Sequence, residues 1–113
     1  MSDQRYEFYI AGVQHHKAHQ VLKELEVYME LALFPELEER VLKYDASAIQ
    51  IRYVHKDNPD QMTMLGYVPM KFSSMVTAFM TVNDNVCCTI TELDVMEKPW
   101  KQIKVVIEEK EDA

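Results

Sequence analysis

Three histidines close together are the side chains in this sequence best suited to metal chemistry. His15, His16 and His19 carry imidazole nitrogens of the kind that ligate zinc. No cysteine or carboxylate stands at a recognised ligand spacing from them, and His15 and His16 fall where a predicted strand gives way to a predicted helix. Polar side chains at such a junction commonly cap the helix or face water. The sequence therefore favours surface or capping histidines, and we expect no cofactor.

The sequence lacks the usual motifs for nucleophilic catalysis and for phosphate transfer. No serine is flanked by glycines, no cysteine stands beside a candidate histidine, and the only two glycines, Gly12 and Gly66, cannot form a glycine-rich phosphate loop. Carboxylates are plentiful, but they lie in charge runs typical of solvated surface, and no pair is singled out for acid and base work. These observations predict a protein that is not an enzyme.

The two cysteines are adjacent, at Cys87 and Cys88. Neighbouring side chains on a strand point to opposite faces, so this pair cannot link distant parts of the fold. We expect one buried and one half-exposed free thiol.

The net charge of −7 works against tight non-specific binding to a polyanion. Acid is concentrated between Glu24 and Glu39 and again at the C-terminal end. Bases or neutral polar residues away from these runs could still form a local patch, and they comprise residues 14–17, Lys43, Arg52 and Lys71.

Alternating apolar residues predict six strands, and one-sided apolar stripes predict two helices. The strands are expected at residues 6–13, 29–34, 49–54, 62–68, 86–91 and 103–108, and the helices at 18–25 and 72–80. Pro35 should end the second strand, residues 36–43 should form a polar loop or helical turn, and Ser73 or Ser74 should cap the second helix. The order β-α-β-β-β-α-β-β indicates a mainly β (α+β) fold: a small OB-like, partly closed six-stranded barrel flanked by two short helices.

The burial or exposure of several large side chains can also be predicted. The spacing of Met70, Met75 and Met80 along the second helix favours the core over a partner groove, and Trp100 is expected to plug the core as well. His55 lies in a turn between two strands, where we expect it to be solvated.

The chain has the length of one ordinary domain, with 113 residues and no internal repeat or linker. We expect residues 1–113 to form a single domain in which 108–113 are a charged C-terminal tail. The first residues lack the pattern of a signal peptide, and no stretch approaches the roughly 18 apolar residues of a membrane span. A cytoplasmic protein that does not enter membranes is expected.

Three segments in order resemble a known family. They are IAGVQ at residues 10–14, KYDASAIQI at 43–51 and LGYVP at 65–69. Together they resemble the HIRAN domain, over residues 8–107. This family has a modified OB-like barrel and occurs in helicase-like DNA repair proteins and as stand-alone bacterial or phage proteins.

The resemblance implies that the protein captures the 3′ end of single-stranded DNA. Tyr44 would stack on the terminal base, and Asp45 would accept a hydrogen bond from the 3′-hydroxyl. His15 falls where the family often has an aromatic residue, and Gln14 where a basic residue can occur. A family lysine falls on Met70, and Lys71 beside it can reach the same place. The resemblance also makes Lys43 and Tyr67 nucleic-acid-binding candidates.

Two functions remain open at this point. The first is a non-catalytic module for single-stranded DNA ends in repair, recombination or replication-fork processing, working beside a separately encoded helicase or nuclease. The second is an acidic domain that keeps the fold without DNA binding and docks on a protein. For the best pair a structural role also stays open, in which Tyr44 packs against the barrel end and Asp45 caps the turn into the third strand.

Overall fold

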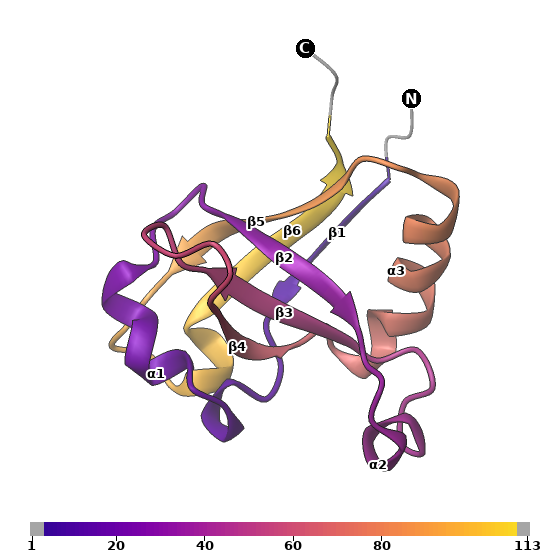
Figure 1. The fold of residues 1–113 in the computed structure, drawn as a ribbon, viewed down its shortest axis with the longest axis horizontal. Helices are drawn as coiled ribbons and strands as arrows, with labels where there is room; N and C mark the ends of the chain where they lie inside the picture. The colour runs from indigo at the N-terminus through magenta and orange to yellow at the C-terminus, as the bar shows by residue number, and fades with distance from the viewer. Residues whose placement is uncertain (1–3, 111–113) are drawn as a thin grey trace.

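Residues 4–110, which the computed structural model describes, form one sheet of six antiparallel strands. Figure 1 shows how the strands and helices are arranged. The strands are β1 (Arg5–Tyr9), β2 (Glu30–Pro35), β3 (Ile49–Val54), β4 (Met62–Tyr67), β5 (Val86–Leu93) and β6 (Ile103–Glu109). They pair in the order β1-β6-β5-β2-β3-β4. The sheet curls into a half-barrel, so the predicted small, mainly β, OB-like fold is confirmed.

Short helical segments join the strands. The α-helices are α1 (Ala18–Val21), α2 (Glu39–Leu42) and α3 (Met70–Val82), and the 3-10 turns are η1 (Val13–His15), η2 (Leu22–Glu24) and η3 (Pro99–Lys101). The first predicted helix is thus broken into α1 and η2, although its stripe of Ala18, Val21 and Leu25 is buried as expected. The helical turn expected within residues 36–43 is α2.

The second predicted helix begins earlier than expected. α3 starts at Met70 behind Pro69, whose ring fixes φ at a value that suits a helix start. Neither Ser73 nor Ser74 is its cap, because both lie inside the helix. Asn83 ends it and donates from its side-chain amide to the carbonyl oxygen of Phe79, at 2.8 Å.

One bridge brings the two edges of the sheet together. The backbone N–H groups of Ala11 and Tyr67 each donate to the other residue's carbonyl oxygen, both at 2.9 Å. A Cβ at Gly66 would lie 2.3 Å from the carbonyl oxygen of Ala11, which is inside van der Waals contact. The partial closure of the barrel therefore requires glycine at position 66.

The core fills the inside of this curl. Ile49, Ile51 and Tyr53 point inward from β3, as their alternation predicts. α3 covers one side of the sheet, where Phe72 stacks on Phe8 with ring centroids 5.4 Å apart. The prediction for the thiols is confirmed, since Cys88 is buried and Cys87 is half-exposed.

Several large side chains lie outside the core, contrary to prediction. Met70 and Met75 are exposed because Phe72, Val76 and Phe79 already supply the buried stripe of α3. Trp100 is 49% exposed in η3, where the Lys98 ammonium lies 5.7 Å from its ring centroid.

Polar groups and strand ends also differ from prediction. His55 is half-buried and its Nε2 lies 2.7 Å from the Thr63 hydroxyl, so it is not simply solvated. Pro35 ends β2 as predicted, whereas β5 continues to Leu93 and β6 runs to Glu109. Glu108 and Glu109 are therefore strand residues, and 111–113 of the predicted tail lie outside the described residues.

Candidate functional site

The ring of Tyr44 is free to meet a ligand. Tyr44 follows α2 in the loop of residues 36–48, which we call the Tyr44 loop, and it is 82% exposed. Its backbone N–H donates to the carbonyl oxygen of Val41, at 3.0 Å, so the end of α2 holds the main chain while the ring points away from the core. The alternative in which this tyrosine packs against the barrel end is wrong.

Asp45 is held by two hydrogen bonds. Its Oδ1 accepts from the backbone N–H of Ser47, at 3.0 Å, and from the buried hydroxyl of Ser73 on α3, at 2.9 Å. The first is the side-chain cap of a turn, so the structural role considered for this aspartate is confirmed. Both bonds use Oδ1, which leaves Oδ2 to accept a further hydrogen bond.

The other polar or basic candidate residues are exposed on the Tyr44 loop itself, on α3 and in η1. Lys43 is exposed directly before Tyr44, and Lys71 is exposed in the first turn of α3. Gln14 and His15 are exposed in η1. In Figure 1 the segment after β1 and the Tyr44 loop both lie along the lower edge of the view, the first on the left near α1 and the second on the right around α2.

Tyr67 differs from the other candidates because its polar group is already bound. Its hydroxyl donates to Glu36 Oε2, at 2.9 Å, and its ring meets the ring of His16 edge-on, with centroids 5.5 Å apart. Burial, together with the hydrogen bond and the charge of Glu36, raises the pKa of Tyr67 to about 12. Tyr67 is therefore a neutral donor within a protein network.

Glu36 is the residue at this site that sequence reasoning missed. It stands in an acidic run, yet only 6% of it is exposed. Its carboxylate accepts from the Gln50 side-chain amide, from Tyr67 and from the backbone N–H of Glu38, the last at 3.3 Å. Burial alone would raise the pKa of Glu36, but these hydrogen bonds and the charge of Arg52 outweigh it and lower that pKa. The neighbouring residues in the sequence gave no sign of this, because the network depends on strand register, in which Phe34, Gln50 and Tyr67 are paired neighbours.

Arg52 extends the same network across the outer face of β2 and β3. Its guanidinium donates from Nε to Gln50 Oε1, at 2.8 Å, and lies over the Phe34 ring, 4.5 Å from the centroid. This arginine is thus ordered by protein contacts rather than projecting into solvent.

The three histidines near η1 differ in their surroundings. His15 and His19 are exposed, whereas His16 is half-buried against Tyr67. Burial, and then the charge of His15, lowers the pKa of His16, while Glu36 opposes this change. Within residues 4–110, no three His, Cys, Asp or Glu side chains lie together in a way that would hold a metal ion.

A hollow lies between the Tyr44 loop and α3, next to the residues that follow Asp45. Its volume is about 330 Å³, and its lining includes Ala46, Ser47 and Thr77. The Thr77 hydroxyl donates to the carbonyl oxygen of Ser47, at 3.3 Å, and so bridges the hollow's two walls. Apolar and small side chains on this lining suit the flat or aliphatic part of a ligand better than a charge.

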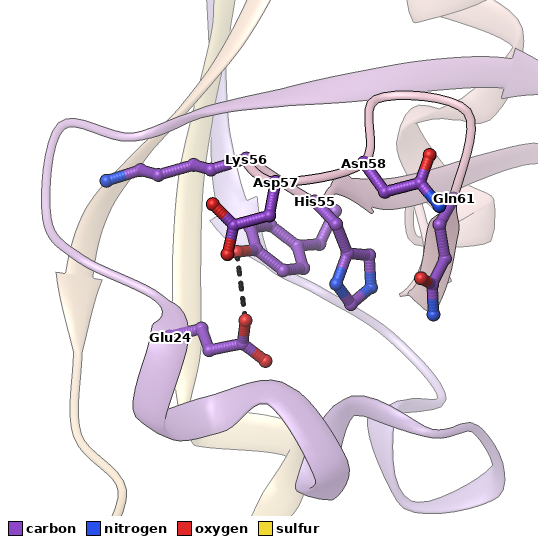
Figure 2. Close-up of a pocket in the computed structure, with 7 residues that line it drawn as sticks. Glu24, His55, Lys56, Asp57, Asn58 and Gln61 are labelled. Atoms are coloured by element: carbon purple, nitrogen blue, oxygen red, sulfur yellow. Dashed lines mark hydrogen bonds between the residues drawn. The ribbon is translucent and has the colours of Figure 1, made fainter.

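A second, polar pocket of about 430 Å³ lies at the turn between β3 and β4 (Figure 2). The buried Tyr53 contributes to it, and its hydroxyl donates to Glu24, at 3.4 Å. The other lining residues are His55, Lys56, Asp57, Asn58 and Gln61. No residue predicted for nucleic-acid binding lines this pocket.

The sequence-predicted residues lie on four parts of the fold, with Lys71 on α3 and Tyr67 at the end of β4. Tyr44, Asp45 and Lys43 belong to the Tyr44 loop, and Gln14 and His15 belong to η1.

No helix within the described part of the chain is long and apolar enough to cross a membrane. In comparisons with known proteins, no family model, curated protein or solved structure matches this chain.

Proposed function

We propose that this protein is a non-catalytic module that binds the 3′-hydroxyl end of single-stranded DNA, as the HIRAN resemblance implies. The observation that carries the proposal is the pairing of an aromatic ring that is 82% exposed, Tyr44, with an adjacent carboxylate, Asp45, held by two hydrogen bonds. An exposed ring can stack on any base, and a fixed carboxylate can accept from a terminal hydroxyl.

The neighbouring groups fit a strand end. The hollow between the Tyr44 loop and α3 has mainly apolar and hydroxyl walls, with Glu36 among its lining residues, and these walls suit a sugar or base better than a phosphate. Lys43 and Lys71 can meet the last phosphates, and His15 can offer a second ring or a positive charge from η1. Few basic groups take part, so the affinity would come from the end of the strand rather than from a long phosphate track.

The charge of the protein sets a limit on this interaction. With a net charge of −7, the chain would repel the body of a nucleic acid except where a lysine intervenes. This charge fits a protein that contacts only the last few nucleotides of a strand. A separately encoded helicase or nuclease would supply that strand end, in repair, recombination or replication-fork processing.

A protein-docking function is the second candidate, and exposed apolar side chains favour it. Leu37 is 88% exposed on the Tyr44 loop, and Met70 is 63% exposed at the start of α3. Exposed large apolar side chains such as these and Tyr44 are a feature of surfaces that bind other proteins.

Titration with short oligonucleotides tests the choice. We expect saturable binding of a single strand that ends in a 3′-hydroxyl, at low and at moderate salt, and much weaker binding of the same strand with a 3′-phosphate. Absence of saturable binding at low salt would reject the DNA-end function and leave protein docking.

A further inference from the structure

The two segments proposed to bind the strand end are joined through one residue. Tyr67, the last residue of β4, pairs by its backbone with Ala11, two residues before η1 begins, and by its ring with His16, directly after η1 ends. Its hydroxyl donates to Glu36, the first residue of the Tyr44 loop, at 2.9 Å. Tyr67 thus contacts the η1 segment on one side and the Tyr44 loop on the other.

Glu36 in turn holds both ends of its loop. Its backbone N–H donates to the carbonyl oxygen of Ala48, at 2.9 Å, which closes the loop at its base. One carboxylate oxygen, Oε1, accepts from the Glu38 backbone inside the loop, while Oε2 accepts from Gln50 and Tyr67 on the sheet. The loop is therefore fastened to β3 and β4 through one buried side chain.

Direct contact with nucleic acid would suit neither residue. Glu36 lines the hollow beside its loop, but it is only 6% exposed and negatively charged, so it offers little surface to a ligand and would repel a phosphate. The hydroxyl of Tyr67 would have to leave a charge-assisted hydrogen bond to reach a ligand, which opposes that role.

We infer that Tyr67 and Glu36 are positioning residues, which hold the Tyr44 loop and the η1 segment in one arrangement before a ligand arrives. A surface ordered in advance loses less conformational entropy on binding, so such a pair raises affinity without touching the ligand. The coupling between the two segments stands on the structure alone, and only its effect on DNA affinity rests on the proposed function.

Amide hydrogen exchange measures the coupling directly. Tyr67→Phe removes one hydroxyl and keeps the ring and the backbone pairing with Ala11, but the ring is no longer anchored to Glu36 and so is no longer fixed in place against His16. We expect exchange at Glu38 and Ala48 in the loop, and at His16 beside η1, to become about fivefold faster or more, as loss of a hydrogen bond predicts.

Tyr53→Phe is the matched control, because it also removes the hydroxyl of a tyrosine bound to a glutamate. Its partner Glu24 lies at the other pocket (Figure 2), so exchange in both segments should stay unchanged. Glu36→Gln is a second test of the pair, since it keeps one acceptor oxygen and should loosen the same amides.

A spectroscopic readout separates positioning from a general loss of stability. The NMR titration midpoint of the Glu36 carboxyl carbon should rise in Tyr67→Phe, because a hydrogen bond that favours the charged form is gone. In Tyr53→Phe it should not move.

Oligonucleotide binding is the last measurement. Tyr67→Phe should weaken binding of the 3′-hydroxyl oligonucleotide about fivefold or more, while Tyr53→Phe binds like wild type. If the wild type binds no oligonucleotide, the proposed function fails, yet the exchange and titration results still decide the coupling. Unchanged exchange in both segments of Tyr67→Phe, or loosening of only one, would overturn the inference.

Discussion

The hydroxyl of Ser73 lies 2.9 Å from Oδ1 of Asp45 and joins the first turns of α3 to the Tyr44 loop. The same hydroxyl lies 3.0 Å from the carbonyl oxygen of Met70, and because it has one proton it serves one acceptor at a time. Ser73 is only 1% exposed, so water cannot readily replace it as a donor to the carboxylate. A serine inside a helix is therefore part of how the candidate site is held.

Ser73→Ala should destabilise the protein by about 1 to 2 kcal/mol, because a buried hydrogen bond to a carboxylate is lost while the helix backbone is unaffected. Urea unfolding measures the free energy. Ser74→Ala, at the neighbouring exposed position, should change it by less than about 0.5 kcal/mol. Equal stability of both variants would show that the Ser73 hydrogen bond contributes nothing.

Gly66→Ala should be among the most damaging single substitutions in the chain. The new Cβ would lie 2.3 Å from the Ala11 carbonyl oxygen and 2.7 Å from Ile10 Cγ2, and backbone cannot move aside cheaply. We expect a loss of about 3 kcal/mol or more in urea unfolding.

Gly12→Ala provides the comparison. Gly12 has a φ of +72°, but the nearest atoms to a new Cβ would be 3.9 Å away. Only the left-handed backbone would be strained, at about 1 to 2 kcal/mol. A smaller effect at Gly66 than at Gly12 would contradict the close approach of the two sheet edges.

Local periodicity was enough to predict most elements of this fold. The alternation of Ile49, Ile51 and Tyr53 and the stripe of Phe72, Val76 and Phe79 each depend on neighbours within one strand or helix. Such patterns identify the face that must be buried, which is why the strands and α3 were recognised before any contact was known.

Long-range relationships could not be predicted in the same way. The need for glycine at position 66 depends on the backbone of Ala11, far away in sequence, and the burial of Glu36 depends on Gln50 and Tyr67 on two other strands. Within its own acidic run Glu36 resembles its solvated neighbours. Exposure of Tyr44 could be proposed from the family resemblance but not deduced from its neighbours, since a lone tyrosine fits either a core or a surface.

Stability should fall at acid pH in a way that depends on Glu36. Its pKa in the folded protein is lowered from the ordinary value of 4.5, because hydrogen bonds and Arg52 outweigh its burial. A lowered folded pKa stabilises the protein fully above the unfolded value, and this contribution is lost as pH falls through the folded value. Wild type should exceed Glu36→Gln in free energy of unfolding above about pH 4.5, and the difference should shrink below it.

Urea titrations across this range measure that difference. Glu39→Gln is the control, at an exposed position of the same loop, and its difference from wild type should vary much less with pH. A pH-independent difference for Glu36→Gln would show that its carboxylate is not specifically stabilised.

Tyr44→Ala should leave the fold intact and remove binding. With 82% of the residue exposed, truncation deletes little packing, so the free energy of unfolding should change by less than about 0.5 kcal/mol. Loss of a stacked base should weaken oligonucleotide binding by about 1 to 3 kcal/mol. Binding as tight as that of wild type would remove Tyr44 from the proposed site, and a large loss of stability would mean that its ring is packed.

Asp45→Asn isolates the charge of the second residue of the pair. Asparagine keeps an oxygen where Oδ1 accepts from Ser47 and Ser73, so the turn and the link to α3 should survive. A hydroxyl-ended strand should bind about tenfold or more weaker, because a hydrogen bond to a charged group is worth about 1.5 to 3 kcal/mol.

A strand that ends in a 3′-phosphate should respond to Asp45→Asn in the opposite direction. Wild type should bind it poorly, since the carboxylate would face a like charge, whereas the asparagine variant should recover part of the affinity because that repulsion is gone. Fluorescence titration of the two oligonucleotides with the two proteins gives four affinities. If the proposed site is right, the wild-type preference for the hydroxyl-ended strand over the phosphate-ended strand should become smaller or reverse in Asp45→Asn. Equal wild-type affinity for both ends would leave Asp45 with its structural role alone, as the acceptor that fixes the turn at Ser47 and fastens the loop to α3.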